Sequence, residues 1–278
     1  MSKVDLHIHT TASDGKYTPA EIVRKAREAG LLYIAICDHD SFEGVASAQE
    51  AALRYPGLTV IGGVEINTDI PTGELHILGY FYDLDNLELK QTLERLRSSR
   101  VERAQLIINK LRKMGIKIDF VRVEELAGNG AIGRPHIAQA MLEKGYINSF
   151  KEAFLKYLNR GGPAYVERAK ITPAEATRLI TQAGGLPVLA HPLTFDNFES
   201  AIAAELKPAG LIGMEVYCNN YTPDQIQNLL RIAETYSLIP TGGSDYHGVD
   251  SMNEPSLGTL EVPLESVERL IALRATLR

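Results

Sequence analysis

The sequence is poor in cysteine and has no long apolar run. Its two cysteines, Cys37 and Cys218, lie far apart and each within an apolar segment. We therefore expect two buried free thiols rather than a disulfide or a thiolate metal site. No apolar stretch approaches the length of a membrane span, and the chain enters its first predicted strand without a basic-then-apolar signal segment. These absences predict a cytoplasmic location and no membrane association.

Charge is unevenly distributed along the 278 residues, whose net charge is −6. Residues 83–170 carry 17 Lys and Arg against 11 Asp and Glu, a net of +6, so the remainder carries a net of −12. An acidic body that binds cations, beside a basic middle segment, fits an anionic substrate held between them. The alternative is that long surface helices are simply rich in Lys and Arg.

Short apolar runs alternate with helical segments over most of the chain, which predicts an α/β fold with a parallel sheet, open or closed. Three predicted helices begin with a Thr cap, then Pro, then Glu or Gln three residues after the cap: Thr18, Thr172 and Thr222. We expect helices over 19–29, 44–54, 173–183, 198–206, 223–236 and 265–277. The expected strands cover 4–9, 33–37, 59–64, 74–82 (as one half of a hairpin), 186–190, 211–217, 239–241 and 258–262.

The middle of the chain breaks this alternation. Residues 87–114 have the charge and the intermittent leucine stripe of one long helix, and further helices are expected over 137–144 and 150–158. We predict a core formed by 1–82 and 171–278, with 83–170 as an inserted helical subdomain. The alternative is that 83–170 is an elaborate loop of the barrel, which differs from an inserted subdomain mainly in name.

Candidate metal ligands follow directly on five of the apolar runs. Parallel sheets and barrels place their sites at the carboxyl ends of strands, so these side chains are expected to converge. A lone histidine after a strand is more often a structural hydrogen-bonding residue. Five strand ends that all carry His or a carboxylate are difficult to explain in that way: His7 and His9, then Asp38-His39-Asp40, then Glu65, His191, and Asp245 with His247.

The first strand is the strongest part of this pattern. His7 and His9 are two residues apart, so they point to one face of a strand and can bind one ion, while Asp14 in the next loop could bind a neighbouring ion. We predict that six of the seven histidines and several carboxylates close one polynuclear metal site. Six histidines with three carboxylates would give the site nine ligands.

This ligand set contains imidazole and carboxylate but no thiolate, which suits Mn, Fe or Zn rather than a closed structural zinc site. Nine ligands exceed the needs of one ion, so two or three divalent ions are expected, with Glu65 well suited to bridging two of them. Such ions activate a water, orient it and neutralise charge on phosphoryl oxygens. Hydrolysis of a phosphate ester needs all three effects, although a metal-dependent amidohydrolase would use a similar barrel.

Several motifs resemble those of the polymerase and histidinol phosphatase (PHP) superfamily of phosphoesterases. They occur in the family's order from end to end of the chain: Asp5-Leu6-His7-Ile8-His9-Thr10 with Ser13-Asp14-Gly15, Ala35-Ile36-Cys37-Asp38-His39-Asp40, Gly63-Val64-Glu65, Leu75-His76-Ile77-Leu78-Gly79-Tyr80, Ala190-His191-Pro192 and Gly243-Ser244-Asp245-Tyr246-His247.

The resemblance implies a distorted (β/α)7 TIM-like barrel that holds a trinuclear cluster. It implies one ion on His7, His9, Glu65 and Asp245, a second on Glu65, His76 and His191, and a third on Asp14, His39 and His247. Many family members have His where this chain has Asp14, which bears on the metal preference or occupancy of the third site.

Within the superfamily the chain is most similar to the bacterial TrpH/YciV type, through Gly133-Arg134-Pro135-His136-Ile137-Ala138 and Asn159-Arg160-Gly161-Gly162-Pro163-Ala164-Tyr165-Val166. That group resembles phosphatases of 3′,5′-nucleoside bisphosphates and nucleoside monophosphates, and 5′→3′ exonucleases on short RNA. Arg134 can meet a phosphate with two hydrogen bonds beside a helix start that favours anions. A structural salt bridge for Arg134 and a solvated surface role for Arg160 are the alternatives.

These observations predict a metal-dependent phosphoesterase in which a metal-bridging hydroxide attacks the phosphorus of a nucleotide or short RNA end. The candidate catalytic residues are His136, Arg134 and Glu65, and the candidate substrate-binding residues are Arg134, His136, Arg160 and Asp14. His136 could equally be a hydrogen-bonding residue at a helix start. The rival functions are a small-molecule phosphatase such as histidinol phosphatase and a non-catalytic metal-binding module. We infer no obligate protein partner.

Overall fold

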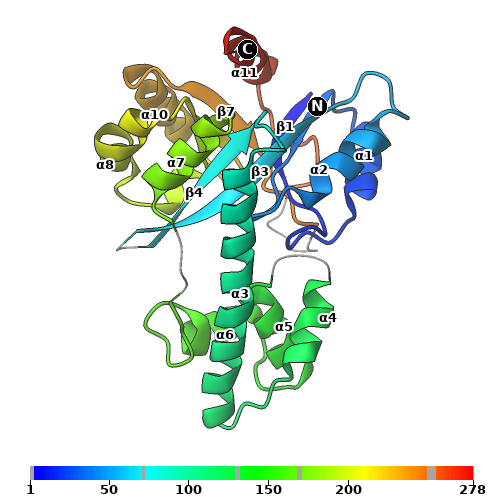
Figure 1. The fold of residues 1–278 in the computed structure, drawn as a ribbon, viewed down its shortest axis with the longest axis vertical. Coiled ribbons are helices and arrows are strands. Elements are labelled where there is room, and N and C mark those ends of the chain that lie inside the picture. The colour runs from blue at the N-terminus through cyan, green and yellow to red at the C-terminus, as the bar shows by residue number, and fades with distance from the viewer. Residues whose placement is uncertain (1–2, 71–72, 129–131, 168–170, 249–254, 278) are drawn as a thin grey trace.

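The computed structural model describes residues 3–70, 73–128, 132–167, 171–248 and 255–277 (Figure 1). Within these residues, seven strands form one sheet whose spatial order follows the chain. The strands β1 and β7 lie in contact, and Ile8 pairs in parallel with Tyr246, so the sheet nearly closes into a barrel. The strands are β1 (Val4–Ile8), β2 (Tyr33–Ile36), β3 (Thr59–Ile70), β4 (Gly73–Tyr80), β5 (Leu186–Leu189), β6 (Gly213–Cys218) and β7 (Ile239–Gly243).

Helices flank this barrel, which confirms the predicted α/β class and the distorted seven-stranded barrel. The three predicted capping boxes at Thr18, Thr172 and Thr222 are present and begin α1, α7 and α10. The barrel helices are α1 (Pro19–Glu28), α2 (Glu43–Ala52), α7 (Pro173–Gln182), η2 (Pro192–Thr194), α8 (Phe198–Ala201), η3 (Ile202–Leu206), α9 (Lys207–Ala209), α10 (Pro223–Thr235) and α11 (Leu264–Thr276).

Strand β4 runs antiparallel to both of its neighbours, whereas the other neighbouring strands run parallel. It forms the expected hairpin with β3, in a register that places His76 opposite Asn67. The partner strand β3 extends to Ile70, beyond the predicted end at residue 64, because its second half pairs with β4. The amino-terminal end of β4 therefore lies at the carboxyl ends of its neighbours, where the candidate ligands gather.

The strand predicted over 258–262 is wrong. Val262 is buried, but its backbone N–H bonds to the carbonyl of Leu260 in a local turn, and Thr259 bonds back to Ser256 in the same way. The apolar side chains pack against the barrel without joining its hydrogen-bonded ladder. Both cysteines are buried free thiols, as predicted.

The middle of the chain is helical and includes α4, which the sequence pattern did not indicate. In Figure 1, α3 runs from the barrel into the helical lobe below it. Its first half packs against the barrel through Leu89, Leu93 and Leu96, while Ile107 and Leu111 belong to a separate hydrophobic cluster with α4 and α5. The elements are α3 (Leu87–Lys113), α4 (Phe120–Ala127), α5 (Arg134–Glu143), α6 (Phe150–Ala153) and η1 (Phe154–Leu158).

The predicted end of the insertion, residue 170, lies outside the described residues. No helix in the described ranges is both long and apolar enough to cross a membrane.

We expect Leu93→Ala to lower the free energy of unfolding by about 2–5 kcal/mol, because the side chain is 2% exposed in the core that joins α3 to the barrel. The matched control is Leu106→Ala in the same helix, whose side chain is 52% exposed and should cost about 0.5 kcal/mol or less. Urea denaturation followed by circular dichroism measures both. Equal losses would contradict the packing of α3 described here.

Candidate metal centre

Nine side chains converge at the carboxyl end of the barrel, and we call them the donor cluster. They come from β1 and the loops after β1, β2, β5 and β7, and from the β3–β4 hairpin. These are the nine predicted ligands: His7, His9, Asp14, His39, Glu65, His76, His191, Asp245 and His247.

Glu65 is the centre of the donor cluster and has no exposed surface. Its Oε2 lies 3.4 Å from His7 Nε2, 3.3 Å from His9 Nε2 and 2.8 Å from His39 Nδ1. Its Oε1 lies 2.8 Å from His76 Nδ1 and 3.0 Å from His191 Nε2. One carboxylate thus contacts five imidazoles, with its two oxygens facing different groups of rings.

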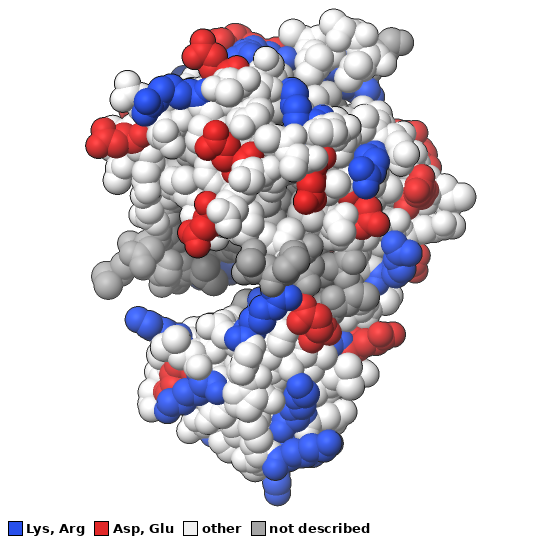
Figure 2. Space-filling model, turned by 90° about the vertical axis from the view of Figure 1, so that its left-hand side faces the viewer, with Lys and Arg blue, Asp and Glu red and all other residues white. Residues whose placement is uncertain are grey.

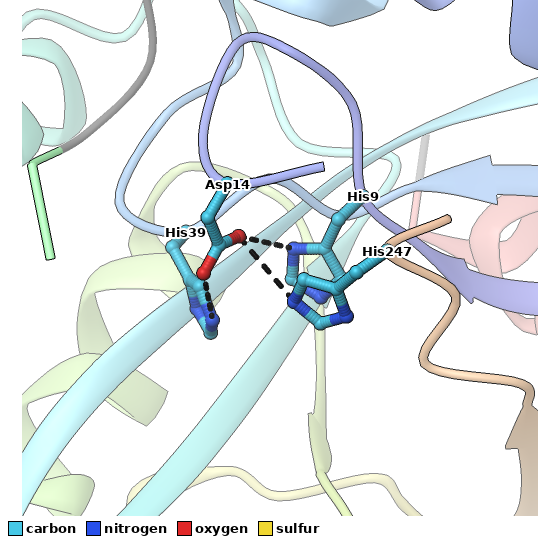
Figure 3. Close-up of side chains that lie close together, drawn as sticks. All are labelled: His9, Asp14, His39 and His247. Atoms are coloured by element: carbon cyan, nitrogen blue, oxygen red, sulfur yellow. Dashed lines mark ion pairs between the residues drawn. The ribbon is translucent and has the colours of Figure 1, made fainter. Parts of the chain in front are cut away.

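Asp14 holds a second group of imidazoles on the other side of His9 (Figure 3). Its Oδ1 lies 3.6 Å from His9 Nδ1 and 3.3 Å from His247 Nε2, and its Oδ2 lies 3.7 Å from His39 Nε2. The rings of His9 and His247 are stacked with their centroids 4.0 Å apart. The loop after β1 therefore delivers a carboxylate against three rings that come from three different parts of the chain.

Three sets of donor atoms within the cluster are close enough to hold an ion each. One set is identical to the first predicted ion site: His7, His9, Glu65 and Asp245. A second contains Asp14, His39 and His247 as predicted, together with His9. The third joins Glu65 and His76 to His39, and the predicted ligand His191 is not part of this set, although its Nε2 lies 3.0 Å from Glu65 Oε1.

Buried donor atoms without a hydrogen bond mark the same place. Within the described residues, five ligand atoms are buried and accept or donate no hydrogen bond: His7 Nε2, His9 Nε2, Asp14 Oδ1, His39 Nδ1 and Glu65 Oε2. Buried polar atoms normally have a hydrogen-bond partner, and a buried polar atom without one costs free energy. Nitrogen and oxygen donors that face one another in this way fit divalent metal ions.

The electrostatics of the cluster hold its carboxylates ionised. Burial raises the pKa of Glu65, but His39, His76 and His7 outweigh it and bring the pKa well below the usual range. Burial likewise raises the pKa of Asp245, and His7 and His9 reverse the shift. Burial lowers the pKa of His9, yet the nearby carboxylates of Asp245 and Glu65 raise it to about 10. A proton on His9 balances part of this negative charge, so metal binding should release protons.

Glu215, on β6, orients two of the candidate ligands from behind. Its Oε1 lies 3.1 Å from His7 Nδ1, and its Oε2 accepts the backbone N–H of His191 at 2.7 Å. A proton shared at Nδ1 leaves His7 Nε2 with its lone pair toward the centre, as in carboxylate–histidine–metal arrangements. The sequence assigned Glu215 no role. Its signal was an acidic residue inside the apolar run of a buried strand.

Asp38 fixes the loop that carries Asp14. This buried carboxylate accepts hydrogen bonds from the backbone N–H of Thr10 at 2.8 Å, its hydroxyl at 2.8 Å and the Ser13 hydroxyl at 2.6 Å. Close packing also aligns β7 with β1, because a Cβ on Gly243 would come within 2.4 Å of His7. Side-chain and backbone contacts together set where the donors of the two loops meet.

Arg100, on α3, reaches the donor cluster from the helical lobe, and the sequence pattern did not single it out. It donates to Asp40 Oδ2 from Nε at 2.8 Å and from Nη2 at 2.6 Å. It also donates to the side-chain carbonyl of Asn67, whose amide nitrogen lies 2.8 Å from His76 Nε2. The helical lobe is therefore joined to the donor cluster by a continuous chain of hydrogen bonds.

A pocket of about 170 Å³ opens between the donor cluster and the helical lobe, and we call it the arginine pocket. Asp14, His39 and His76 form its floor. The helical lobe contributes Arg100, Arg103 and Arg134, together with the aliphatic side chains of Ala104, Ile107, Ile132 and Ile137. A cationic wall thus faces the predicted metal ligands.

Of the other predicted substrate residues, Arg134 lines this pocket and His136 does not. Arg134 is the first residue of α5 rather than the residue before a helix starting at 137, because Pro135 fits the first helical turn. His136 lies in that same turn, where its Nδ1 accepts the N–H of Gly133 at 3.0 Å. Arg160 does not line the pocket; its Nη2 pairs with Glu167 at 2.8 Å and its Nη1 donates to Ile70 at 3.1 Å.

Two relatives are similar to this chain along most of its length. A 5′-3′ exoribonuclease from Haemophilus influenzae is 34% identical over 248 residues, which cover 88% of this chain and 90% of that protein. A 3′,5′-nucleoside bisphosphate phosphatase from Chromobacterium violaceum is 31% identical over 251 residues, which cover 89% of this chain and 88% of that protein.

The fold is also that of a solved structure, an amidohydrolase from Chromobacterium violaceum with bound sulfate and no metal. It aligns with a TM-score of 0.87 and 29% identity, over 98% of this chain and 97% of that one. The PHP domain family matches residues 5–239. This match covers most of the chain and includes seven of the nine donor-cluster positions, so the chain belongs to the PHP domain family.

Proposed function

We propose that this protein is a metal-dependent hydrolase of nucleotide phosphate esters, acting on 3′,5′-nucleoside bisphosphates, nucleoside monophosphates and the 5′-phosphorylated ends of short RNA. The observation that carries the proposal is the donor cluster facing a pocket with three arginines. Metal ligands on one side and phosphate-binding cations on the other suit a small anionic ester. The named activities of the two relatives, an exoribonuclease and a nucleoside bisphosphate phosphatase, support this substrate class.

The donor cluster would hold two or three divalent ions of Mn, Fe or Zn, with Glu65 shared between two of them. Bound ions of this kind activate a water and neutralise the charge that develops on phosphoryl oxygens. The protein supplies the geometry: Glu215 orients His7, and Asp38 holds the loop that carries Asp14.

The arginines bind and orient the ester. Arg100 is engaged with Asp40, whereas Arg134 donates to the carbonyl of Leu158 at a longer 3.3 Å and can exchange that contact for a phosphate oxygen. Because Nδ1 of His136 accepts the Gly133 N–H, the neutral ring carries its proton on Nε2. Burial lowers the pKa of His136, which keeps this neutral form at pH 7. His136 can therefore donate a hydrogen bond to a phosphate oxygen or to the leaving oxygen.

Glu65→Gln should reduce turnover by at least about 100-fold, since even residues behind metal ligands typically contribute 10- to 100-fold. The amide removes the charge that five imidazoles surround, so bound metal per protein should also fall. Phosphate release and metal content by plasma mass spectrometry measure the two effects. Glu199→Gln on the surface of α8 is the matched control and should change neither. Full activity in Glu65→Gln would contradict the proposal that Glu65 is shared between ions.

Arg134→Ala should raise the KM for a 3′,5′-bisphosphate about tenfold or more, as expected for a lost hydrogen bond to a charged group. Arg122→Ala is its control in the same lobe, because Arg122 pairs with Glu125 and Glu143 away from the pocket. Steady-state kinetics with both variants test the assignment. An unchanged KM in Arg134→Ala would leave Arg134 with a structural role only.

Product release from a matched panel, measured as inorganic phosphate for the small esters and as 5′-mononucleotide for the RNA, tests the substrate class. The panel contains a 3′,5′-bisphosphate nucleoside, a 5′-monophosphate, histidinol phosphate and a 5′-phosphorylated RNA pentamer, each with Mn²⁺-loaded protein. We expect higher kcat/KM for the bisphosphate or the RNA, because the arginine pocket can engage a second phosphate. Preference for histidinol phosphate would overturn the nucleotide assignment and keep the metal chemistry. No turnover of any member by metal-loaded protein would favour the non-catalytic alternative.

A further inference from the structure

A second hollow lies on the helical lobe, beside the arginine pocket and separate from the donor cluster. We call it the α3 groove; its volume is about 430 Å³. One wall is the exposed face of α3 with Leu106, Lys110 and Lys113, and the other is the segment with Tyr165 and Glu167. None of these residues has a part in the metal centre or in the proposed chemistry.

The α3 groove and the arginine pocket share a wall. Arg103 lines the pocket, and its guanidinium carbon lies 5.2 Å from the centroid of the Tyr165 ring, which lines the groove. Its Nε donates to the carbonyl of Val166 at 2.7 Å, and Lys110 Nζ donates to the carbonyl of Tyr165 at 2.5 Å. The two hollows therefore adjoin where Arg103 contacts Tyr165 and Val166.

The groove is built from the side-chain types that bind single-stranded nucleic acid. Lys110 and Lys113 are exposed on α3, about 10 and 15 Å along the helix from Arg103 at 1.5 Å per residue. Tyr165 offers a ring and Leu106, 52% exposed, an apolar surface on which bases can lie. The acid in the lining, Glu167, is paired with Arg160. Figure 2 shows that Lys and Arg predominate over Asp and Glu on the helical lobe.

We propose that the α3 groove binds the nucleotides of a single-stranded RNA that follow the one held in the arginine pocket. Lys110 and Lys113 contact the RNA backbone, and Tyr165 and Leu106 support the bases. The inference rests on the proposed function, which places the reacting phosphate in the arginine pocket. It predicts that a mononucleotide uses the pocket alone, whereas an oligonucleotide uses the pocket and the groove.

The test compares Lys110→Ala/Lys113→Ala with wild-type protein on two substrates. With Mn²⁺-loaded protein, the KM of a 5′-phosphorylated RNA pentamer should rise about tenfold, and that of a 3′,5′-bisphosphate nucleoside should not change. Lys113→Ala alone should give a smaller change in the same direction, and it leaves the Lys110 contact with Tyr165 intact. The control is Lys151→Ala/Lys156→Ala, which removes the same amount of positive charge from the same lobe. Both lysines are exposed and neither lines the groove.

Direct binding separates failure of this inference from failure of the proposed function. Fluorescence anisotropy with a 3′-labelled RNA pentamer, in chelator to prevent turnover, reports groove binding whether or not the protein is active. The double variant should bind more weakly, and its salt dependence, the slope of log K against log salt concentration, should fall by about 1.4, or roughly 0.7 per lost phosphate contact. Unchanged pentamer binding, an equal loss in the Lys151/Lys156 control, or an equal rise in KM for the bisphosphate would overturn the inference.

Discussion

The structure depends on one buried carboxylate. Glu65 has no exposed surface, yet its oxygens lie within 3.4 Å of nitrogens from five of the seven histidines. An ionised carboxylate in such a place is costly unless positive charge surrounds it. The raised pKa of His9 lets its ring supply part of that charge as a proton, and divalent ions would supply it when bound. The loops around the barrel mouth can be understood as the means of bringing these rings to a single residue.

Strand β4 is the feature of the fold that makes this arrangement possible. In a regular parallel barrel, the strand after β3 would return through a helix and present its carboxyl end at the site. Here β4 follows β3 through a hairpin, so its amino-terminal end carries His76 to the oxygens of Glu65. The barrel thus departs from a regular parallel arrangement at β4, the strand that brings His76 to Glu65. The long helix α3 is held next to the donor cluster by the ion pair between Arg100 and Asp40.

Local signals in the sequence were sufficient for the barrel and for most of the donor cluster. Strand alternation, Thr-Pro helix caps and the placement of His and carboxylates after apolar runs depend only on neighbouring residues. His76 lacks that signal, because it precedes most of its strand, and only the resemblance to the PHP superfamily indicated it. Glu215 and Arg100 act through partners 208 and 60 residues away, which no local pattern encodes. The apolar run at 258–262 has a strand's composition, but its backbone bonds locally.

The central claim is that Glu65 lies at the middle of a cluster of metal ions. The most direct measurement is anomalous X-ray scattering from crystals of the protein soaked in Mn²⁺. The account predicts two or three peaks at the barrel mouth, with both oxygens of Glu65 bound to manganese and His7, His9 and Asp245 around one peak. A single ion away from Glu65, or no ion among these side chains at saturating manganese, would contradict it.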